Sequence, residues 1–331
     1  MFSGAAACAL EPSVLSFAPR APALPAASFA RDRGRILRSR AFRRLAGKTQ
    51  VVAAPGDPLV RTRLTHTLEV VAIARELGSG LQVRDDLVEA IALAHDVGHP
   101  AFGHAGERAL ASLGGSSFHH AAHGVRVVTV LEPGLDLSVE VVEGILKHSK
   151  GRGGPVFAGG PAQRSATVEA RVVRAADLYA YACHDLDDAY RLGALRPADL
   201  PIEARRVLGA TAESVRASLV DRTLAASGSG GDVRLDDPSA AALEVLRAFL
   251  YESLYESPRI TAQTTFVGAV VACLAGAASA DPESFDRAVG DVTGGALPHA
   301  ASRAFLDTFA SLTDRQALEL HRRFRARGPR A

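Results

Sequence analysis

The sequence has few cysteines, almost no net charge and no long run of large apolar side chains. Its three cysteines, Cys8, Cys183 and Cys273, are odd in number and far apart. That argues against a disulfide framework or a cysteine-based metal site and fits a reducing compartment. With 38 Lys and Arg against 36 Asp and Glu, the formal charge is +2, too small to indicate nucleic acid or a membrane as the main partner. These features predict a cytoplasmic protein.

The segment 262–280 contains no charged residue, so a membrane span has to be considered. It consists mainly of Ala, Gly, Thr, Ser and Gln, which makes it a poor candidate for insertion. We therefore expect a helix buried in a protein core. The first 28 residues are rich in Ala and Pro and have no basic start before an apolar run, so they do not resemble a secretory signal.

No segment alternates between apolar and polar residues as a strand would, and there is no internal repeat. Helical spacing of apolar residues recurs instead, which predicts an all-α protein. We expect a loosely ordered arm over residues 1–30, a catalytic core over 31–195 and a helical C-terminal part over 196–331 packed on that core. The main helices are predicted at 62–77, 85–97, 139–148, 167–191 and 239–255.

Residues 92–110, ALAHDVGHPAFGHAGERAL, concentrate groups that bind metals or transfer protons. An apolar helix leads into this segment, and Gly98-His99-Pro100 interrupts it. His95 and Asp96 are adjacent on that helix, about 100° apart around its axis, so both can flank one ion from the same side. An aspartate on a buried helical stripe is costly unless it is paired or bound to a metal.

Two further residues fit the same ion. His66 lies on an inward-facing stripe of the helix at 62–77, where a lone histidine is more often a hydrogen-bonded core residue than a ligand. Asp177 lies in an otherwise apolar part of the helix at 167–191. Two imidazoles and two carboxylates suit manganese, magnesium, iron, cobalt or zinc, and the sequence does not choose among these divalent metals.

His104 and Glu107 stand three apart at the start of the next predicted helix and so share one face. A carboxylate that orients an imidazole in this way is typical of a general acid or base. The alternative is a surface pair, but the neighbouring candidate metal site favours the catalytic interpretation. Of three more histidines, His119, His120 and His123, we expect only one or two to matter.

The order His66, His95-Asp96, Asp177 is the H…HD…D pattern of the HD superfamily of metal-dependent phosphohydrolases. The flanking words are more specific: AFRRLAGKTQV, DPLVRTRLTHTLEV, EAIALAHDVGHPAFGHAGE, EGILKH, HDLDD, LYESLY and LTDRQAL. Together they resemble the deoxyguanosine triphosphate triphosphohydrolase family, with gaps, from about Arg31 to about Arg323.

The resemblance implies an all-helical HD-domain fold that hydrolyses deoxynucleoside triphosphates to deoxynucleoside and inorganic triphosphate. It also implies a homo-oligomer and allows for an activating nucleotide. Carried over by position, the metal ligands are His66, His95, Asp96 and Asp177. The catalytic residues are His104, Glu107 and His120. The substrate-binding residues are Arg44 near the deoxyribose, Arg63 and His99 at the phosphates, and Tyr181 and Asp185 at the sugar.

The sequence departs from the family pattern at several positions. His119 and Ala121 stand where Glu and Asn are usual, Leu178 follows the metal aspartate where Glu is common, and Ala101 replaces a proline. The loop between Leu110 and Phe118 is short, which bears on allosteric or subunit contacts. None of these changes removes a predicted ligand or the catalytic pair, so we expect a working enzyme with an altered substrate preference.

Two other functions stay open at this point. One is a different HD phosphohydrolase, a nucleotidase or a phosphodiesterase, which would not release inorganic triphosphate. The other is a non-catalytic nucleotide sensor that uses the pocket only for binding. The presence of both His104 and Glu107 counts against the sensor, because binding alone does not need a general acid–base pair. The base preference cannot be derived from the residues.

Overall fold

The computed structural model describes residues 28–51, 60–113, 118–149, 165–228, 232–297, 299 and 303–326. Within these ranges there is no strand, only an isolated antiparallel bridge between Thr49 and Thr62. The predicted all-α fold is confirmed. The predicted arm lies almost wholly outside the described residues, and so does most of the short loop after Leu110. The division into a core and a C-terminal part stays a prediction.

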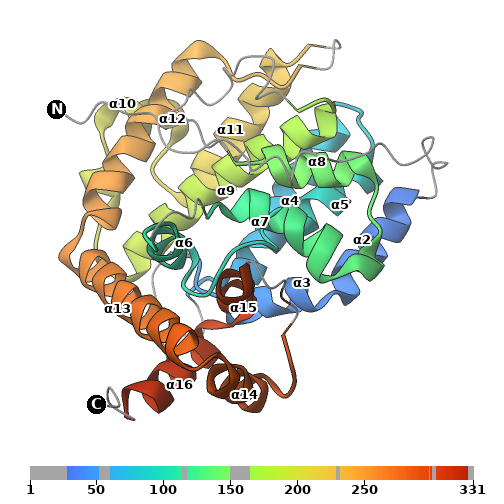
Figure 1. The fold of residues 1–331 in the computed structure, drawn as a ribbon. Helices are drawn as coiled ribbons and strands as arrows, with labels where there is room; N and C mark the ends of the chain where they lie inside the picture. Colours follow the sequence, from blue (N-terminus) through green and yellow to red (C-terminus); the bar gives the residue numbers. More distant parts are fainter. Residues whose placement is uncertain are drawn as a thin grey trace.

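The N-terminal half supplies most of the helices that carry site residues (Figure 1). They are α2 (Ser28–Arg38), α3 (Arg40–Arg44), the short 3-10 helix η1 (Leu45–Gly47), α4 (Arg63–Gly80), α5 (Asp85–Ala94), α6 (Gly103–Ala111), α7 (His120–Arg126), η2 (Val127–Leu131), η3 (Pro133–Leu135), α8 (Val139–Lys147) and α9 (Val168–Arg191).

The C-terminal half completes the molecule. Its elements are η4 (Pro197–Asp199), α10 (Ile202–Leu208), α11 (Ala212–Ala226), α12 (Asp237–Leu250), η5 (Tyr251–Tyr255), α13 (Pro258–Ala280), α14 (Pro282–Thr293), α15 (Ala304–Ser311) and α16 (Asp314–Arg325). Of these, η5 is a single π-helical turn that extends α12. The predicted helix at 239–255 is therefore α12 followed by η5.

Side-chain caps explain where several of these helices begin. The Thr62 hydroxyl accepts the Thr65 backbone N–H, and the Thr65 hydroxyl accepts that of Thr62, which closes the start of α4. Thr313 and Gln316 form the same reciprocal cap at α16. Each cap satisfies backbone N–H groups that the first helical turn leaves unpaired.

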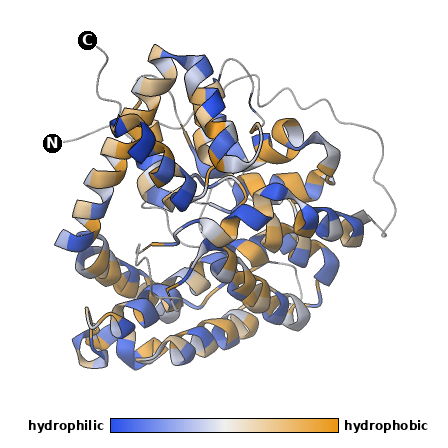
Figure 2. Ribbon diagram, turned by 90° about the horizontal axis from the view of Figure 1, so that it is seen from below, coloured by the Kyte–Doolittle hydropathy of each residue, from blue (hydrophilic) through white to orange (hydrophobic). Residues whose placement is uncertain are grey.

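The helices enclose two apolar cores. The larger core lies among α2, α4, α5, α8, α9, α11 and α12, and the smaller lies among α6, α13, α14, α15 and α16. The same helices carry hydrophobic and hydrophilic stretches (Figure 2), as expected when one face packs inward. Helix α5 ends in the larger core and α6 begins in the smaller one. The segment between them, which carries His95, Asp96 and His99, therefore bridges the two cores.

Helix α13 differs in part from the prediction of a buried core helix. One face, with Val267, Val270, Val271 and Leu274, is buried in the smaller core, whereas Phe266 is 47% exposed on the other. Among the described helices it is the one long and apolar enough to cross a membrane, on length and composition alone, and 28% of the window concerned is buried. The absence of charge identified the helix but did not reveal that only one of its faces is buried.

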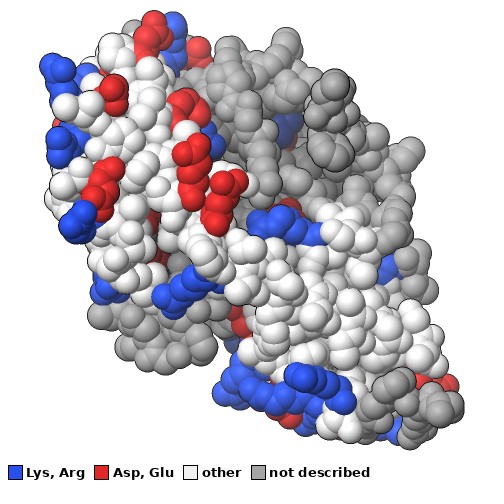
Figure 3. Space-filling model, turned by 90° about the vertical axis from the view of Figure 1, so that its left-hand side faces the viewer, with Lys and Arg blue, Asp and Glu red and all other residues white. Residues whose placement is uncertain are grey.

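Basic side chains gather at the lower edge of the face shown in Figure 3, at the end of the molecule where α14 and α16 lie in Figure 1. The last turn of α16 carries Arg322, Arg323 and Arg325. Two of them form ion pairs with Glu319 on the same helix. The charge at this edge is therefore partly neutralised within α16 itself.

Lys48, which is buried, and Asp314, which is half-buried, fasten the C-terminal helices to the segment between α5 and α6. Lys48 Nζ donates to the carbonyls of His99, at 2.5 Å, and Ala310, at 2.7 Å. Asp314 accepts the backbone N–H groups of Thr49, at 2.9 Å, and Phe102, at 2.6 Å. Phe102 has a φ of 62°, an unusual conformation for a residue with a side chain. The Asp314 bond therefore holds a strained turn just before α6.

Replacing Asp314 with alanine tests this joint. The N–H groups of Thr49 and Phe102 would lose their acceptor, which is expected to cost about 2–3 kcal/mol and to lower the melting temperature by roughly 5 °C. Melting followed by circular dichroism measures the effect. The control is Asp286→Ala at an exposed position of α14, and equal losses in both variants would contradict the account.

Candidate functional site

The segment between α5 and α6 packs directly on α7 because it contains Gly98. A Cβ at that position would lie 2.1 Å from the carbonyl oxygen of His120 and 2.2 Å from the backbone nitrogen of Gly124. Only glycine permits this approach. It brings the His99 and His120 rings into a stack, with centroids 3.9 Å apart and planes 12° apart.

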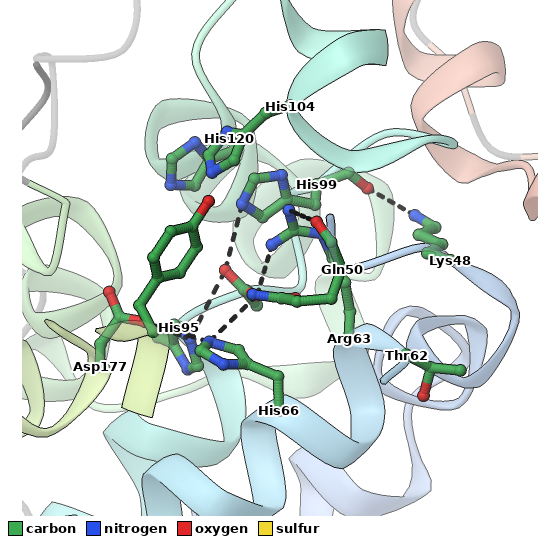
Figure 4. Close-up of polar contacts among 12 residues, drawn as sticks. Lys48, Gln50, Thr62, Arg63, His66, His95, His99, His104, His120 and Asp177 are labelled. Carbon is green, nitrogen blue, oxygen red and sulfur yellow. Dashed lines mark hydrogen bonds and ion pairs between the residues drawn. The ribbon is translucent and has the colours of Figure 1, made fainter. Parts of the chain in front are cut away.

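The structure brings the four predicted metal ligands together from α4, the end of α5 and α9 (Figure 4). His66 Nε2 lies 3.1 Å from Asp177 Oδ1 and 4.0 Å from Asp96 Oδ2. His95 Nε2 lies 3.5 Å from Asp96 Oδ1 and 3.7 Å from Asp177 Oδ1. Ligand atoms of His66, His95 and Asp96 all lie within 4.8 Å of one another. This donor set fits a divalent ion.

The protonation states of His95 and His66 also fit a metal site. His95 donates its Nδ1–H to the Ala92 carbonyl at 2.7 Å, so its Nε2 carries a lone pair. That Nε2 is buried and has no hydrogen-bond partner among the described residues. Burial lowers the pKa of His66 to about 4, more than the nearby Asp177 raises it, so His66 is neutral near pH 7. Neutral imidazoles are the form that binds metals.

The carboxylates are ionised for a related reason. Burial alone would raise the pKa of Asp177, but its close contacts with His66 and His95 lower the pKa by more, to below its usual range. Burial would likewise raise the pKa of Asp96, which Arg63 and His99 hold well below the ordinary value. Both aspartates are therefore available as anionic ligands.

Arg63, predicted to bind phosphate, lies behind the metal site rather than on an open wall. It is 1% exposed, and its Nη1 donates to Asp96 Oδ2 at 2.7 Å. His99, also predicted at the phosphates, is buried and places its Nε2 3.2 Å from Asp96 Oδ1. In this geometry both residues neutralise a predicted metal ligand.

A pocket of about 830 Å³ opens over the cluster and is large enough for a nucleotide-sized ligand. Six of the predicted residues line it, and Asp177 faces both the pocket and the two metal-site imidazoles. The six are His104, Glu107, His120, Asp177, Tyr181 and Asp185.

Glu107 binds His104 and His120 at once. Its Oε2 lies 2.9 Å from His104 Nδ1, and its Oε1 accepts the His120 backbone N–H and lies 2.8 Å from His120 Nδ1. Burial would raise the pKa of Glu107, but His120 and His104 lower it far below the usual range. An ionised Glu107 only accepts hydrogen bonds, so His104 donates Nδ1–H and keeps a lone pair on Nε2. With His99 these residues also have the composition of a metal site, but both Nδ1 atoms already face Glu107.

Arg44 is not brought to this pocket. It lines a separate small cavity with Lys48 and Glu132, and its guanidinium lies 4.0 Å from the Glu132 carboxylate. Helix α3, which carries Arg44, directs it toward the start of η3. The predicted contact with deoxyribose therefore has no geometric support.

Sequence reasoning passed over several residues that line the pocket. Arg108, Arg174 and Arg247 contribute positive charge, and Tyr251 and Tyr255 contribute aromatic surface. Arg174 stands three residues before Asp177 on α9, so helical spacing from a predicted metal ligand was the signal available for Arg174.

Two other residues near the site were also passed over. His148 places its Nε2 3.2 Å from His120 Nε2. Gln50 has a buried side-chain amide with no hydrogen-bond partner among the described residues. The backbone carbonyl of Gln50 accepts a hydrogen bond from Arg63. Neither shows a local sequence signal, because both reach the site through long-range packing.

Asp185 lines the pocket together with Tyr181 and Tyr255. The Tyr255 hydroxyl lies 2.8 Å from Asp185 Oδ2 and 2.5 Å from the Tyr181 hydroxyl. Burial raises the pKa of Asp185 to about 8, despite the opposing effect of Tyr255. At neutral pH the group is a neutral acid, so it both donates and accepts hydrogen bonds at the pocket wall.

Comparison with known proteins gives two matching families. The HD domain matches residues 63–182, and the phosphohydrolase-associated domain matches residues 233–323. HD domains are metal-dependent hydrolases, and the His and Asp cluster described above lies within the first match.

Full-length relatives match most of the chain. A deoxyguanosinetriphosphate triphosphohydrolase-like protein of Desulfatibacillum aliphaticivorans is 38% identical over 309 residues, 91% of this chain and 88% of that protein. Deoxyguanosinetriphosphate triphosphohydrolase-like protein 1 of Deinococcus radiodurans is 37% identical over 92% of this chain and 91% of its own length. A crystal structure of a hypothetical protein from Aquifex aeolicus aligns with 73% of this chain and 58% of its own, at 21% identity and a TM-score of 0.43, too distant to inform the site.

The raised pKa of Asp185 predicts a pH-dependent stability. The Asp185 carboxyl ionises at about 3.9 in the unfolded chain but only at about 8 in the folded protein. Its contribution to the free energy of unfolding is therefore lost as pH rises between those two values. Asp185→Asn removes the effect. Its melting temperature should match wild type near pH 4.5 and exceed it at pH 8 by roughly 5 °C or more.

Melting curves of the chelator-treated proteins at both pH values measure this difference. Asp286→Asn, at an exposed position, is the control and should follow wild type throughout. A difference between Asp185→Asn and wild type that stays constant with pH would show that Asp185 is ionised in the fold.

Proposed function

We propose a reaction for this chain from the premise that it belongs to the family of deoxyguanosinetriphosphate triphosphohydrolase-like proteins, which are HD-domain phosphohydrolases. The chain hydrolyses deoxynucleoside triphosphates to deoxynucleoside and inorganic triphosphate. The observation that carries this proposal is the shared pocket. The metal-type cluster reaches the pocket through Asp177, directly beside the imidazole–carboxylate pair of His104 and Glu107.

His66, His95, Asp96 and Asp177 would hold the divalent ion. When bound, such an ion draws electron density from a phosphoryl oxygen or a water, which makes phosphorus more electrophilic or water more acidic. Its identity among manganese, magnesium, iron, cobalt and zinc stays open. Arg63 and His99 support the ion indirectly, because they stabilise the ionised form of Asp96.

His104 is the proton-transfer group. Burial lowers its pKa, so near neutral pH it is uncharged and its Nε2 lone pair can accept a proton. We assign it as the general base that takes a proton from water. The water oxygen bonds to the α-phosphorus, the bond to the 5′-oxygen breaks, and the 5′-oxygen leaves as the deoxynucleoside hydroxyl after taking up a proton.

The pocket lining contains the two kinds of group that this substrate requires. Arg108, Arg174 and Arg247 contribute cationic groups that can pair with phosphates. Tyr181, Asp185 and Tyr255 form a hydrogen-bonding group suited to a sugar. A cytoplasmic location, assembly of several chains and activation by a second nucleotide accompany the proposal as predictions from the resemblance.

The products test the reaction most directly. Each of the four deoxynucleoside triphosphates would be incubated with the protein and Mn²⁺ or Mg²⁺, alone and in mixtures, and the products separated. Free deoxynucleoside and inorganic triphosphate, both lost on chelation, are expected. Orthophosphate or pyrophosphate would instead identify another HD phosphohydrolase, and nucleotide binding without turnover would identify a sensor.

Two substitutions separate chemistry from metal binding. His104→Ala is expected to reduce kcat by at least about 100-fold while metal content stays near wild type, because His104 is not among the proposed ligands. Asp177→Ala should lose both activity and metal. Turnover rates and metal analysis of the purified proteins provide the readouts. If His104→Ala kept most of its activity, the general-base assignment would be wrong.

A further inference from the structure

His66 differs from the other proposed imidazole ligand in what binds its second nitrogen. His95 donates Nδ1–H to the Ala92 carbonyl three residues earlier on its own helix, at 2.7 Å. His66 Nδ1 instead lies 3.1 Å from Nδ1 of His184 on α9, with the rings nearly perpendicular. The orientation of His66 therefore depends on a residue far away in the sequence.

The protonation of the two imidazoles determines which of them donates the hydrogen bond. Two facing imidazole nitrogens form a hydrogen bond only if one carries the proton and the other a lone pair. His66 Nε2 faces Asp177 and Asp96 and must keep its lone pair to bind an ion. His66 then carries its proton on Nδ1 and donates it to His184. His184 Nδ1 must be unprotonated, so the His184 proton is on Nε2.

Glu69 lies where it can select that form of His184. Its Oε2 is 2.5 Å from His184 Nε2, and an ionised carboxylate accepts a proton but cannot donate one. Arg61 binds the other oxygen, with Nε 3.0 Å from Glu69 Oε1, and Arg61 is itself held by Asp187 and Asp188. His184 therefore accepts a hydrogen bond from His66, and Glu69 accepts one from His184 and another from Arg61.

We propose that His184 and Glu69 are positioning residues that hold His66 with its proton on Nδ1 and its Nε2 lone pair directed at the metal site. The inference rests on the proposed function only in taking His66 as a metal ligand. Partners of this kind act on metal affinity by fixing the tautomer and the ring orientation. His184 does not line the pocket, so its effect on substrate passes through His66.

Paired substitutions at His184 separate hydrogen bonding from packing. His184→Phe keeps an aromatic ring in this buried position but removes the acceptor for His66. His184→Asn shortens the side chain but places an amide oxygen near the former Nδ1, so the acceptor is kept. Mn²⁺ affinity of the chelator-treated proteins, measured from free Mn²⁺ by electron paramagnetic resonance, should weaken about 10- to 100-fold in His184→Phe. His184→Asn should stay within about threefold of wild type.

A second pair of variants tests the carboxylate. Glu69→Gln retains an oxygen but loses the negative charge, and it should weaken Mn²⁺ binding roughly tenfold. The matched control is Glu76→Gln on the same helix, since Glu76 is similarly exposed and also pairs with an arginine, Arg216, but does not contact a histidine. Glu76→Gln should bind Mn²⁺ like wild type. Melting curves without metal confirm that each variant is folded.

The outcomes distinguish this inference from the proposed reaction. Equal losses in His184→Phe and His184→Asn, or wild-type affinity in His184→Phe and Glu69→Gln, would overturn the positioning role while leaving triphosphate production untouched. If His66→Ala bound Mn²⁺ as tightly as wild type, the metal assignment and the positioning role would both be wrong.

Discussion

The ion pair between Arg63 and Asp96 is the contact on which the rest of the site depends. Asp96 is 3% exposed, and a carboxylate taken so far out of water stays ionised only if cations or donors replace the lost hydration. Arg63 supplies the nearest charge, at 2.7 Å, and His99 a second contact, at 3.2 Å. Because Arg63 opens α4 and Asp96 follows α5, this pair also fixes how the two helices that carry His66 and His95 meet.

Around this pair the molecule separates two kinds of chemistry that share a pocket. The metal-type cluster is held mainly by helices of the larger core, whereas His104 and Glu107 lie on α6, which packs in the smaller core. Asp314 and Lys48 bind the turn between them. The distance between the proposed ion and His104, the proposed base, therefore depends on how the C-terminal helices pack.

Much of this arrangement could be predicted from the sequence, because helical spacing is a local property. It placed Asp177 on an inward face and His104 with Glu107 on one face. It gave no role to His184 or Glu69, because their contact forms only when α4 and α9 are packed together. The role carried over to Arg44 stays a prediction, and in this structure Arg44 lines a different cavity. The absence of charge identified α13 but did not reveal that one of its faces is exposed.

The central claim is that one ion lies between His66, His95, Asp96 and Asp177. The most direct measurement is an anomalous difference map from crystals soaked in Mn²⁺. We predict one strong peak per chain bounded by the two imidazole Nε2 atoms and the two carboxylates. A peak instead in another group with the composition of a metal site, such as His99, His104, Glu107 and His120, would contradict the account, as would the absence of any peak.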